Sequence, residues 1–174
     1  MKKIQKNDGF TLIELLIVVA IIGIIAAIAV PGLLRARMSG NEASSLGSMR
    51  AINTAQQGYS QICNGFAQLH TGLNYAPGGG QPFLSPDMTA ANPTNKSGYA
   101  TTSTAAGGAV TGHPCTGQTV HTQYFVASAP LSWGSTGSRH FGSDEAGTIF
   151  QNTANTAFTS DAQLVIGGTI TVIQ

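Results

Sequence analysis

The first third of the chain carries two hydrophobic patterns in succession. Residues 15–34 hold no charged side chain, and twenty helical residues rise about 30 Å, the hydrocarbon thickness of a bilayer. Beyond Arg35 the apolar side chains recur at spacings of three and four, as on one helix face. They are Leu46, Met49, Ile52, Ala55, Tyr59, Ile62 and Phe66. The patterns predict a membrane-length helix over 10–34 that continues as an amphipathic helix over 35–63.

The polar residues between these apolar positions fall elsewhere on the helix surface; they include Arg50, Asn53, Gln57 and Ser60. We therefore expect the apolar stripe to pack on a head domain as its core, and not to line a cofactor site. The sequence Asn64-Gly65 is typical of a helix end, so the helix should stop at about residue 63.

The remainder of the chain predicts loops and then a sheet. Residues 64–122 are rich in Gly, Pro, Asn, Ser and Thr and read as a loop region, most clearly over 77–82 and 101–112. Strand signals begin at residue 123, so residues 123–174 should form an antiparallel sheet. The expected strands are 123–128, 139–143 and 148–151, with a turn at 144–147, and a hairpin of 164–166 and 169–173 around Gly167-Gly168. The expected fold is α+β, a long N-terminal helix packed on a small C-terminal antiparallel sheet.

A short basic leader precedes the apolar run. Lys2, Lys3 and Lys6 lie before it, and positive charge ahead of a first membrane helix keeps that end in the cytoplasm. Arg35 and Arg37 follow the run and weaken this bias. In the expected orientation, residues 35–174 lie outside the cytoplasm.

Charge and composition argue against several classes of function. The 174 residues carry a net charge of +1. Loss of residues 1–9 would remove three lysines and one aspartate and leave five basic and six acidic side chains. No basic patch remains for strong nucleic-acid binding. The sequence has no phosphate-binding loop, haem-attachment motif or nucleophile elbow. We therefore expect neither an enzyme nor a cofactor.

The two cysteines, Cys63 and Cys115, would lie in an oxidising compartment, where a disulfide is expected. Closing a loop of about fifty residues would add roughly 4 kcal/mol of stability in the chain-entropy model. The alternative is two unpaired apolar side chains, because nothing in the sequence sets the distance between them.

Two groups of residues invite a metal-binding interpretation, and we favour neither. His113 and His121 lie near Cys115, but no second cysteine pair or paired-histidine spacing supports zinc. Asp144, Glu145 and Asp161 could hold calcium, although a solvated acidic turn explains them as well. The expected metal content is none.

A specific motif joins the leader to the apolar run. Gly9 is followed by Phe-Thr-Leu-Ile-Glu-Leu-Leu and then by apolar residues as far as Pro31. This sequence resembles the class III signal of type IV pilins and type II secretion pseudopilins. The resemblance implies that a prepilin peptidase cuts between Gly9 and Phe10 and methylates the new Phe10 amine. The alternative is an ordinary signal-peptidase cut, for which Ala26, Ala27 and Ala29 imitate a site.

Glu14 is the one acidic residue of this segment and lies about one turn into the mature helix. In a bundle of such helices its carboxylate would be buried and would need a partner. The resemblance implies pairing with the Phe10 amine of a neighbouring copy, which fixes the axial stagger; the alternative is a tolerated interfacial glutamate. Gly23 and Pro31 are helix breakers. Either the helix kinks at Pro31 or, as related filaments imply, residues 23–31 lose helicity.

The resemblance implies a structural function. The expected protein is a type IV pilus subunit that waits in the bacterial inner membrane. An assembly platform with an ATPase then extracts it into a helical homo-oligomer on the cell surface, used for adhesion, twitching or DNA uptake. One alternative is a pseudopilin of a periplasmic pseudopilus. Another is a minor tip pilin that captures DNA or a surface, against which Glu14 and the low net charge argue.

Overall fold

The computed structural model describes residues 9–76 and 79–173. The leader lysines Lys2, Lys3 and Lys6, and residues 77–78 of a predicted loop, lie outside the described residues. The chain divides into two compact units, Met1–Ala36 and Arg37–Gln174, and the helix α1 (Leu12–Cys63) contributes to both.

The described part of the first unit consists of residues 9–11 and the beginning of α1. Gly23 and Pro31 both lie inside the helix, so in the single chain residues 23–31 are helical. The aliphatic side chains from Leu12 to Leu34 are about half exposed or more. Among the described residues, α1 is the one helix long and apolar enough to cross a membrane.

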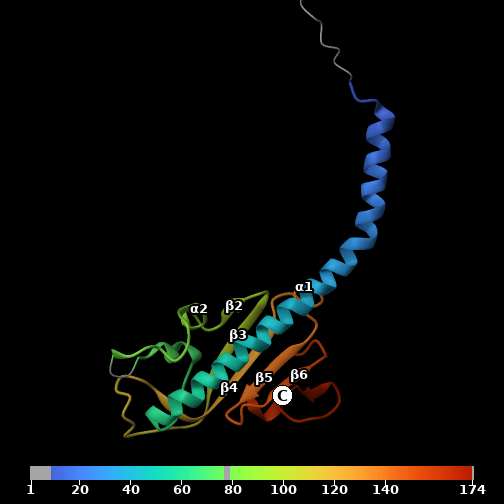
Figure 1. The fold of residues 1–174 in the computed structure, drawn as a ribbon. Helices are drawn as coiled ribbons and strands as arrows, with labels where there is room; N and C mark the ends of the chain where they lie inside the picture. Colours follow the sequence, from blue (N-terminus) through green and yellow to red (C-terminus); the bar gives the residue numbers. More distant parts are fainter. Residues whose placement is uncertain (1–8, 77–78, 174) are drawn as a thin grey trace, which may run out of the picture. The chain divides into compact units, whose positions relative to one another are not determined.

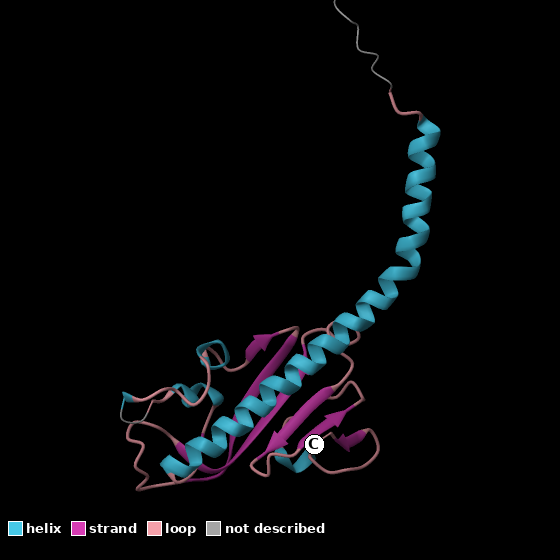
Figure 2. Ribbon diagram, in the orientation of Figure 1, coloured by secondary structure: helices cyan, strands magenta, loops and turns pink. Residues whose placement is uncertain are grey.

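The second unit is an antiparallel sheet crossed on one face by the later part of α1 (Figure 1). Along the sheet the order is β2-β3-β4-β5-β6-β7, and β1 pairs with β4. Figure 2 shows the strands in magenta and the helix that crosses them in cyan. The strands are β1 (Phe66–Ala67), β2 (Thr94–Lys96), β3 (Tyr99–Ala109), β4 (Val120–Pro130), β5 (His140–Asp144), β6 (Ile149–Asn152) and β7 (Ile170–Val172). Short helical turns lie between them: η1 (His70–Asn74), α2 (Pro86–Thr89) and η3 (Asp161–Gln163). This is the α+β architecture that the sequence predicts.

The predicted stripe on α1 forms most of the core, with two corrections. Met49, Ile52, Ala55 and Tyr59 are buried against the sheet, but Ile62 is 46% exposed. Asn53, predicted to lie away from the core, is buried. Its amide donates to Ser143 Oγ at 2.8 Å, and its oxygen accepts from the Tyr124 hydroxyl at 3.0 Å. These bonds satisfy its polar atoms, so the residue can replace an apolar one in the core.

The interpretation of 101–112 as a loop is wrong, and the region 64–122 therefore contains strands as well as loops. β3 spans Tyr99–Ala109 and pairs with β4 along most of its length. Its buried positions are Tyr99, Thr101 and Ser103. Thr101 and Ser103 carry hydroxyl groups, which bond to Ser128 and His70. The buried side of β3 is therefore partly polar, and the strand lacks the alternating apolar pattern by which a sequence reveals a strand.

The hairpin expected over 164–173 is also wrong. β7 pairs with β6 and not with residues 164–166. Leu164 turns into a small cluster with Phe125 and Phe158, directly after η3, so the backbone there is not an extended strand. Val165 and Ile166 are exposed, and the tight turn lies between Gly167 and Ile170.

Several local predictions are confirmed. Helix α1 ends at Cys63, and Asn64 has a φ of 57°, the left-handed conformation of a helix C-terminus. Residues 144–147 form a turn closed by the Gly147 amide and the Asp144 carbonyl at 2.9 Å. β4, β5 and β6 contain the cores of the three expected strands.

Cys63 and Cys115 form a disulfide with a Cα–Cα distance of 5.3 Å. Both residues are buried. The bond ties the end of α1 to the connection between β3 and β4. It closes a loop across a sequence separation of 52, worth roughly 4 kcal/mol in the chain-entropy model.

A partly buried ion pair joins Glu42, near the start of the part of α1 that packs on the sheet, to Arg139. Glu42 Oε2 accepts from Nη2 and Nε of Arg139 at 2.6 and 2.9 Å, and Glu42 Oε1 accepts from the Ser138 amide at 2.8 Å. Burial acts to raise the pKa of Glu42, but the hydrogen bonds from Ser138 and Arg139 outweigh it and hold the pKa below its ordinary value.

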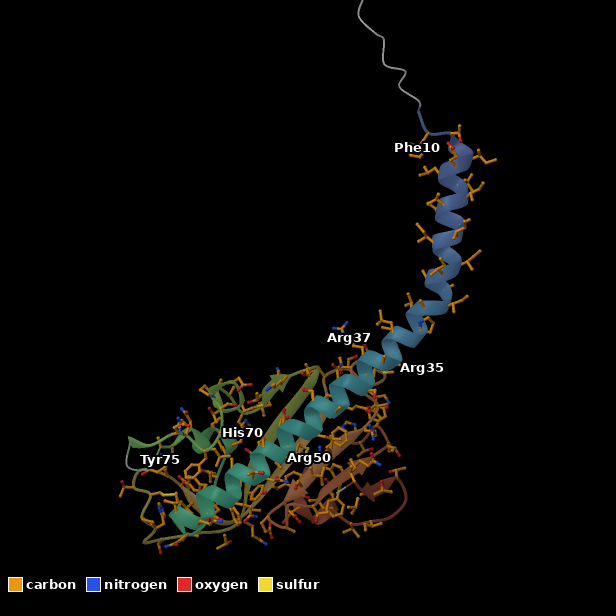
Figure 3. All side chains as sticks on the ribbon, viewed as in Figure 1. Phe10, Arg35, Arg37, Arg50, His70 and Tyr75 are labelled. Carbon is orange, nitrogen blue, oxygen red and sulfur yellow. A yellow bond between two sulfur atoms is a disulfide. The ribbon has the colours of Figure 1, made fainter. Side chains whose placement is uncertain are left out.

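His70 holds η1 against the sheet from a fully buried position; Figure 3 labels it. Its Nε2 lies 2.9 Å from the Ala91 carbonyl oxygen, which can only accept, so Nε2 carries the hydrogen. Its Nδ1 lies 2.7 Å from Ser103 Oγ, which donates to it. Burial lowers the pKa of His70, although the bond to Ala91 acts in the opposite direction.

We predict that Glu42→Ala destabilises the head by about 2 kcal/mol, because it leaves Arg139 and the Ser138 amide without their buried partner. Urea unfolding of the purified full chain in detergent, followed by circular dichroism, measures this. The control is Lys96→Ala, which removes an ion pair to Asp87 that is about half exposed and should leave the urea midpoint nearly unchanged. Equal midpoints for the two variants would contradict the assigned role of Glu42.

Acidification should destabilise the head through His70. The folded state binds this proton less readily than the unfolded chain does, so the contribution is complete above about pH 6.5 and is lost as the pH falls below it. His140, whose pKa burial also lowers, acts in the same direction. Melting temperatures measured from pH 7.5 to 5 should fall, and should fall less steeply for His70→Gln. If the melting temperature of His70→Gln falls with pH as steeply as that of the parent, His70 does not contribute to the destabilisation by acid.

Candidate functional site

The N-terminal turn of α1 carries the residues singled out in the sequence. Thr11 precedes the helix, and its amide and hydroxyl both donate to Glu14 Oε2, at 2.9 and 2.7 Å. The Glu14 amide in turn donates to Thr11 Oγ1 at 3.3 Å. This reciprocal arrangement is a capping box, which satisfies two of the amides that a helix N-terminus leaves unpaired.

The capping box escaped the sequence interpretation of Glu14, although its signature, a threonine three residues before a glutamate, is present in Thr11-Leu12-Ile13-Glu14. The Glu14 carboxylate therefore caps its own helix in the single chain. Both bonds use Oε2, and Oε1 accepts no hydrogen bond from any described residue. As far as the described residues go, one oxygen of Glu14 is therefore left for a further donor.

The predicted cleavage point is accessible. Phe10 is 94% exposed, and Gly9 is exposed and precedes the helix. Figure 3 labels Phe10 at the start of the segment, where the aliphatic side chains point outward all around the helix. Among the described residues of the first unit, these side chains have no partner on any face. The segment thus offers a long apolar surface with one polar acceptor, the Glu14 carboxylate, near its beginning.

The other candidate residues do not assemble into a site. The Cys115 sulfur is bound to Cys63 and so is not a thiolate ligand beside His113 or His121. In the acidic turn, Asp144 Oδ1 accepts from the Ala146 amide and Glu145 Oε1 accepts from Gln123. Over residues 9–76 and 79–173, no three His, Cys, Asp or Glu side chains gather as metal ligands would.

The N-terminal part of the chain is similar to that of known proteins. The family described as "Prokaryotic N-terminal methylation motif" matches residues 4–30. Type IV major pilin protein PilA of Myxococcus xanthus is 38% identical over 72 residues, which cover 41% of this chain and 33% of that protein. Type IV wide pilus major component PilA4 of Thermus thermophilus is 58% identical over 38 residues, 22% of this chain and 29% of its own length.

A secretion protein is also similar. Type II secretion system core protein G of Vibrio cholerae is 37% identical over 59 residues, which cover 34% of this chain and 40% of that protein. The chain thus spans about a third of the length of these relatives. No solved structure matches it.

Proposed function

Because the chain belongs to the family of type IV pilins and type II secretion pseudopilins, we propose that it is a structural subunit of a type IV pilus. The observation that carries the proposal is the exposed apolar segment, near whose beginning one oxygen of Glu14 accepts no hydrogen bond from a described residue. Relatives named as major pilins support the pilus over other polymers of this family. Proteins of this family are structural and not enzymes.

Polymerisation follows from the exposure of the segment. An apolar helix without a partner is stable in lipid, where tails surround it, and outside lipid only if other apolar surfaces cover it. At about 25 cal/mol per Å² of apolar area kept from water, helices of this length bind one another strongly once they leave the bilayer. Copies of the same segment are the partner that every subunit supplies.

The free oxygen of Glu14 gives this contact a register. Cleavage after Gly9 would create an amine on Phe10, and methylation would leave it positively charged. The amine of a neighbouring copy can donate to Oε1 of Glu14 while Oε2 keeps its bonds to Thr11. A carboxylate surrounded by apolar helices is costly without such a partner, so one axial stagger is favoured over all others.

Several partners belong to this proposal. A prepilin peptidase cuts between Gly9 and Phe10 and methylates Phe10. A platform in the inner membrane, driven by an ATPase, lifts the mature chain out of the bilayer. The subunit then stands in a filament at the cell surface, with the second unit, Arg37–Gln174, as its head. In the filament, residues 23–31 around Gly23 and Pro31 can lose the helicity that they have in the single chain.

A pseudopilin is the second candidate, on the similarity to core protein G of Vibrio cholerae. It would use the same helix contacts in a short periplasmic polymer. Imaging separates the two: a type IV pilus subunit should be the main polypeptide of long surface filaments, identified by mass spectrometry. Filaments confined to the periplasm would favour the pseudopilin.

We predict that Glu14→Ala is processed after Gly9 as the parent is, yet forms at least tenfold fewer filaments. Electron microscopy and immunoblots of sheared surface fractions measure this. The matched control is Glu14→Gln, which keeps an oxygen for the Thr11 amide but has no charge for the neighbouring amine. If the charge sets the register, Gln fails like Ala. Normal filaments from Glu14→Gln would reduce Glu14 to a helix cap.

Gly9→Val should block maturation, because a branched side chain would stand at the residue after which the peptidase cuts. The variant should stay in the membrane with its leader attached, as intact mass spectrometry would show. Detection of a mature chain that begins at Phe10, or of one cut near Ala29, would refute the assigned cleavage.

A further inference from the structure

Two arginines without a partner follow the apolar segment. Arg35 and Arg37 are exposed, and neither has an ion pair or hydrogen bond to any residue that the structure describes. Two other basic side chains of the head, Lys96 and Arg139, are paired with carboxylates. The positive charge beside the apolar segment is therefore available to a partner from outside the chain.

The spacing along the helix matches a bilayer at both ends. Arg35 follows Glu14 by 21 residues, which is a rise of about 32 Å, so the two charges flank a hydrocarbon layer of about 30 Å. Residues 35–40 rise about a further 9 Å, close to the depth of one polar headgroup layer. The contacts of the head begin immediately beyond, where the Asn41 amide donates to the Thr136 carbonyl oxygen at 2.9 Å.

The positions of the two arginines on the helix distinguish between partners. Residues two apart on an α-helix lie about 200° apart around its axis, so Arg35 and Arg37 leave α1 on nearly opposite sides. One carboxylate of a neighbouring copy could meet only one of them. A layer of lipid headgroups surrounds the helix and can meet both, and the planar guanidinium binds phosphate through paired hydrogen bonds.

We propose that Arg35 and Arg37 bind lipid phosphate groups at the outer face of the membrane and so set the depth of the subunit before assembly. The inference rests on the proposed function in one respect, that residues 10–34 span the membrane before extraction. The phosphate contacts hold residues 35–40 in the headgroup layer and leave the head free of it. They are also contacts that extraction must break.

The next charged residue after Arg37 is Glu42, which already pairs with Arg139. Without the two arginines, the uncharged stretch would run from residue 15 to residue 41. A helix with so long an uncharged stretch slides or tilts in the bilayer until more of it is covered. Residues just beyond Arg37 would then move toward the hydrocarbon.

The test measures the depth of Ser39, which is exposed in the described structure. The structure has no free cysteine among the residues it describes, so Ser39→Cys adds one thiol to the full chain. The chain is reconstituted in vesicles of phosphatidylethanolamine and phosphatidylglycerol, and a membrane-impermeant maleimide labels the thiol. Arg35→Ala with Arg37→Ala should slow labelling about fivefold or more. Arg35→Lys with Arg37→Lys is the matched control and should stay within about twofold of the parent.

A second measurement isolates the phosphate. In dodecyl maltoside micelles, which contain none, all three proteins should label at the same rate. Unchanged labelling of the alanine variant in vesicles would overturn the proposal, as would an equal slowing in micelles. Loss of filaments in cells with an unchanged depth in vesicles would instead assign the arginines to carboxylates of neighbouring copies. The vesicle experiment requires no filament, so it remains decisive even if the chain never polymerises.

Discussion

An apolar helix that cannot remain in water constrains everything else in this protein. Residues 15–34 carry no charge and have no partner among the described residues of their own unit. On the proposed function, lipid covers them in one state and copies of the same helix cover them in the other. Neither cover is specific, because both offer only apolar surface. Specificity has to come from the few polar groups at the two ends of the segment, and these are the groups to which the structure draws attention.

The beginning of the segment shows how one residue can serve both states. Glu14 closes a capping box with Thr11 through one oxygen, and its other oxygen accepts no hydrogen bond from the residues that the structure describes. In a single subunit the cap makes the carboxylate tolerable near the membrane, since it neutralises unpaired amides of the first turn. In a polymer the second oxygen can take an amine from another copy. The same side chain stabilises the helix and, on our proposal, selects its register.

The head has to hold an amphipathic helix on a sheet. Polar contacts between α1 and the sheet help to hold the helix in place. Glu42 pairs with Arg139 near the start of the packed half, and Asn53 bonds to Ser143 and Tyr124 further along. Glu42 and Asn53 each have specific partners on the sheet, so a helix shifted by one turn would leave these buried groups unsatisfied. The disulfide at Cys63 then closes the far end.

The sequence by itself determined what depends on period and local chemistry. These features are the continuous helix, its end at Cys63, the turn before β6 and the motif around Glu14. Only the tertiary structure decided that Thr101 and Ser103 are interior residues of a strand, because their hydroxyls are acceptable in a core only beside Ser128 and His70. The same holds for β7, whose partner across the sheet lies outside any local pattern. Hydrophobic periodicity indicates which side chains are buried away from water. The pairing of buried polar groups, in contrast, depends on residues far apart in the chain.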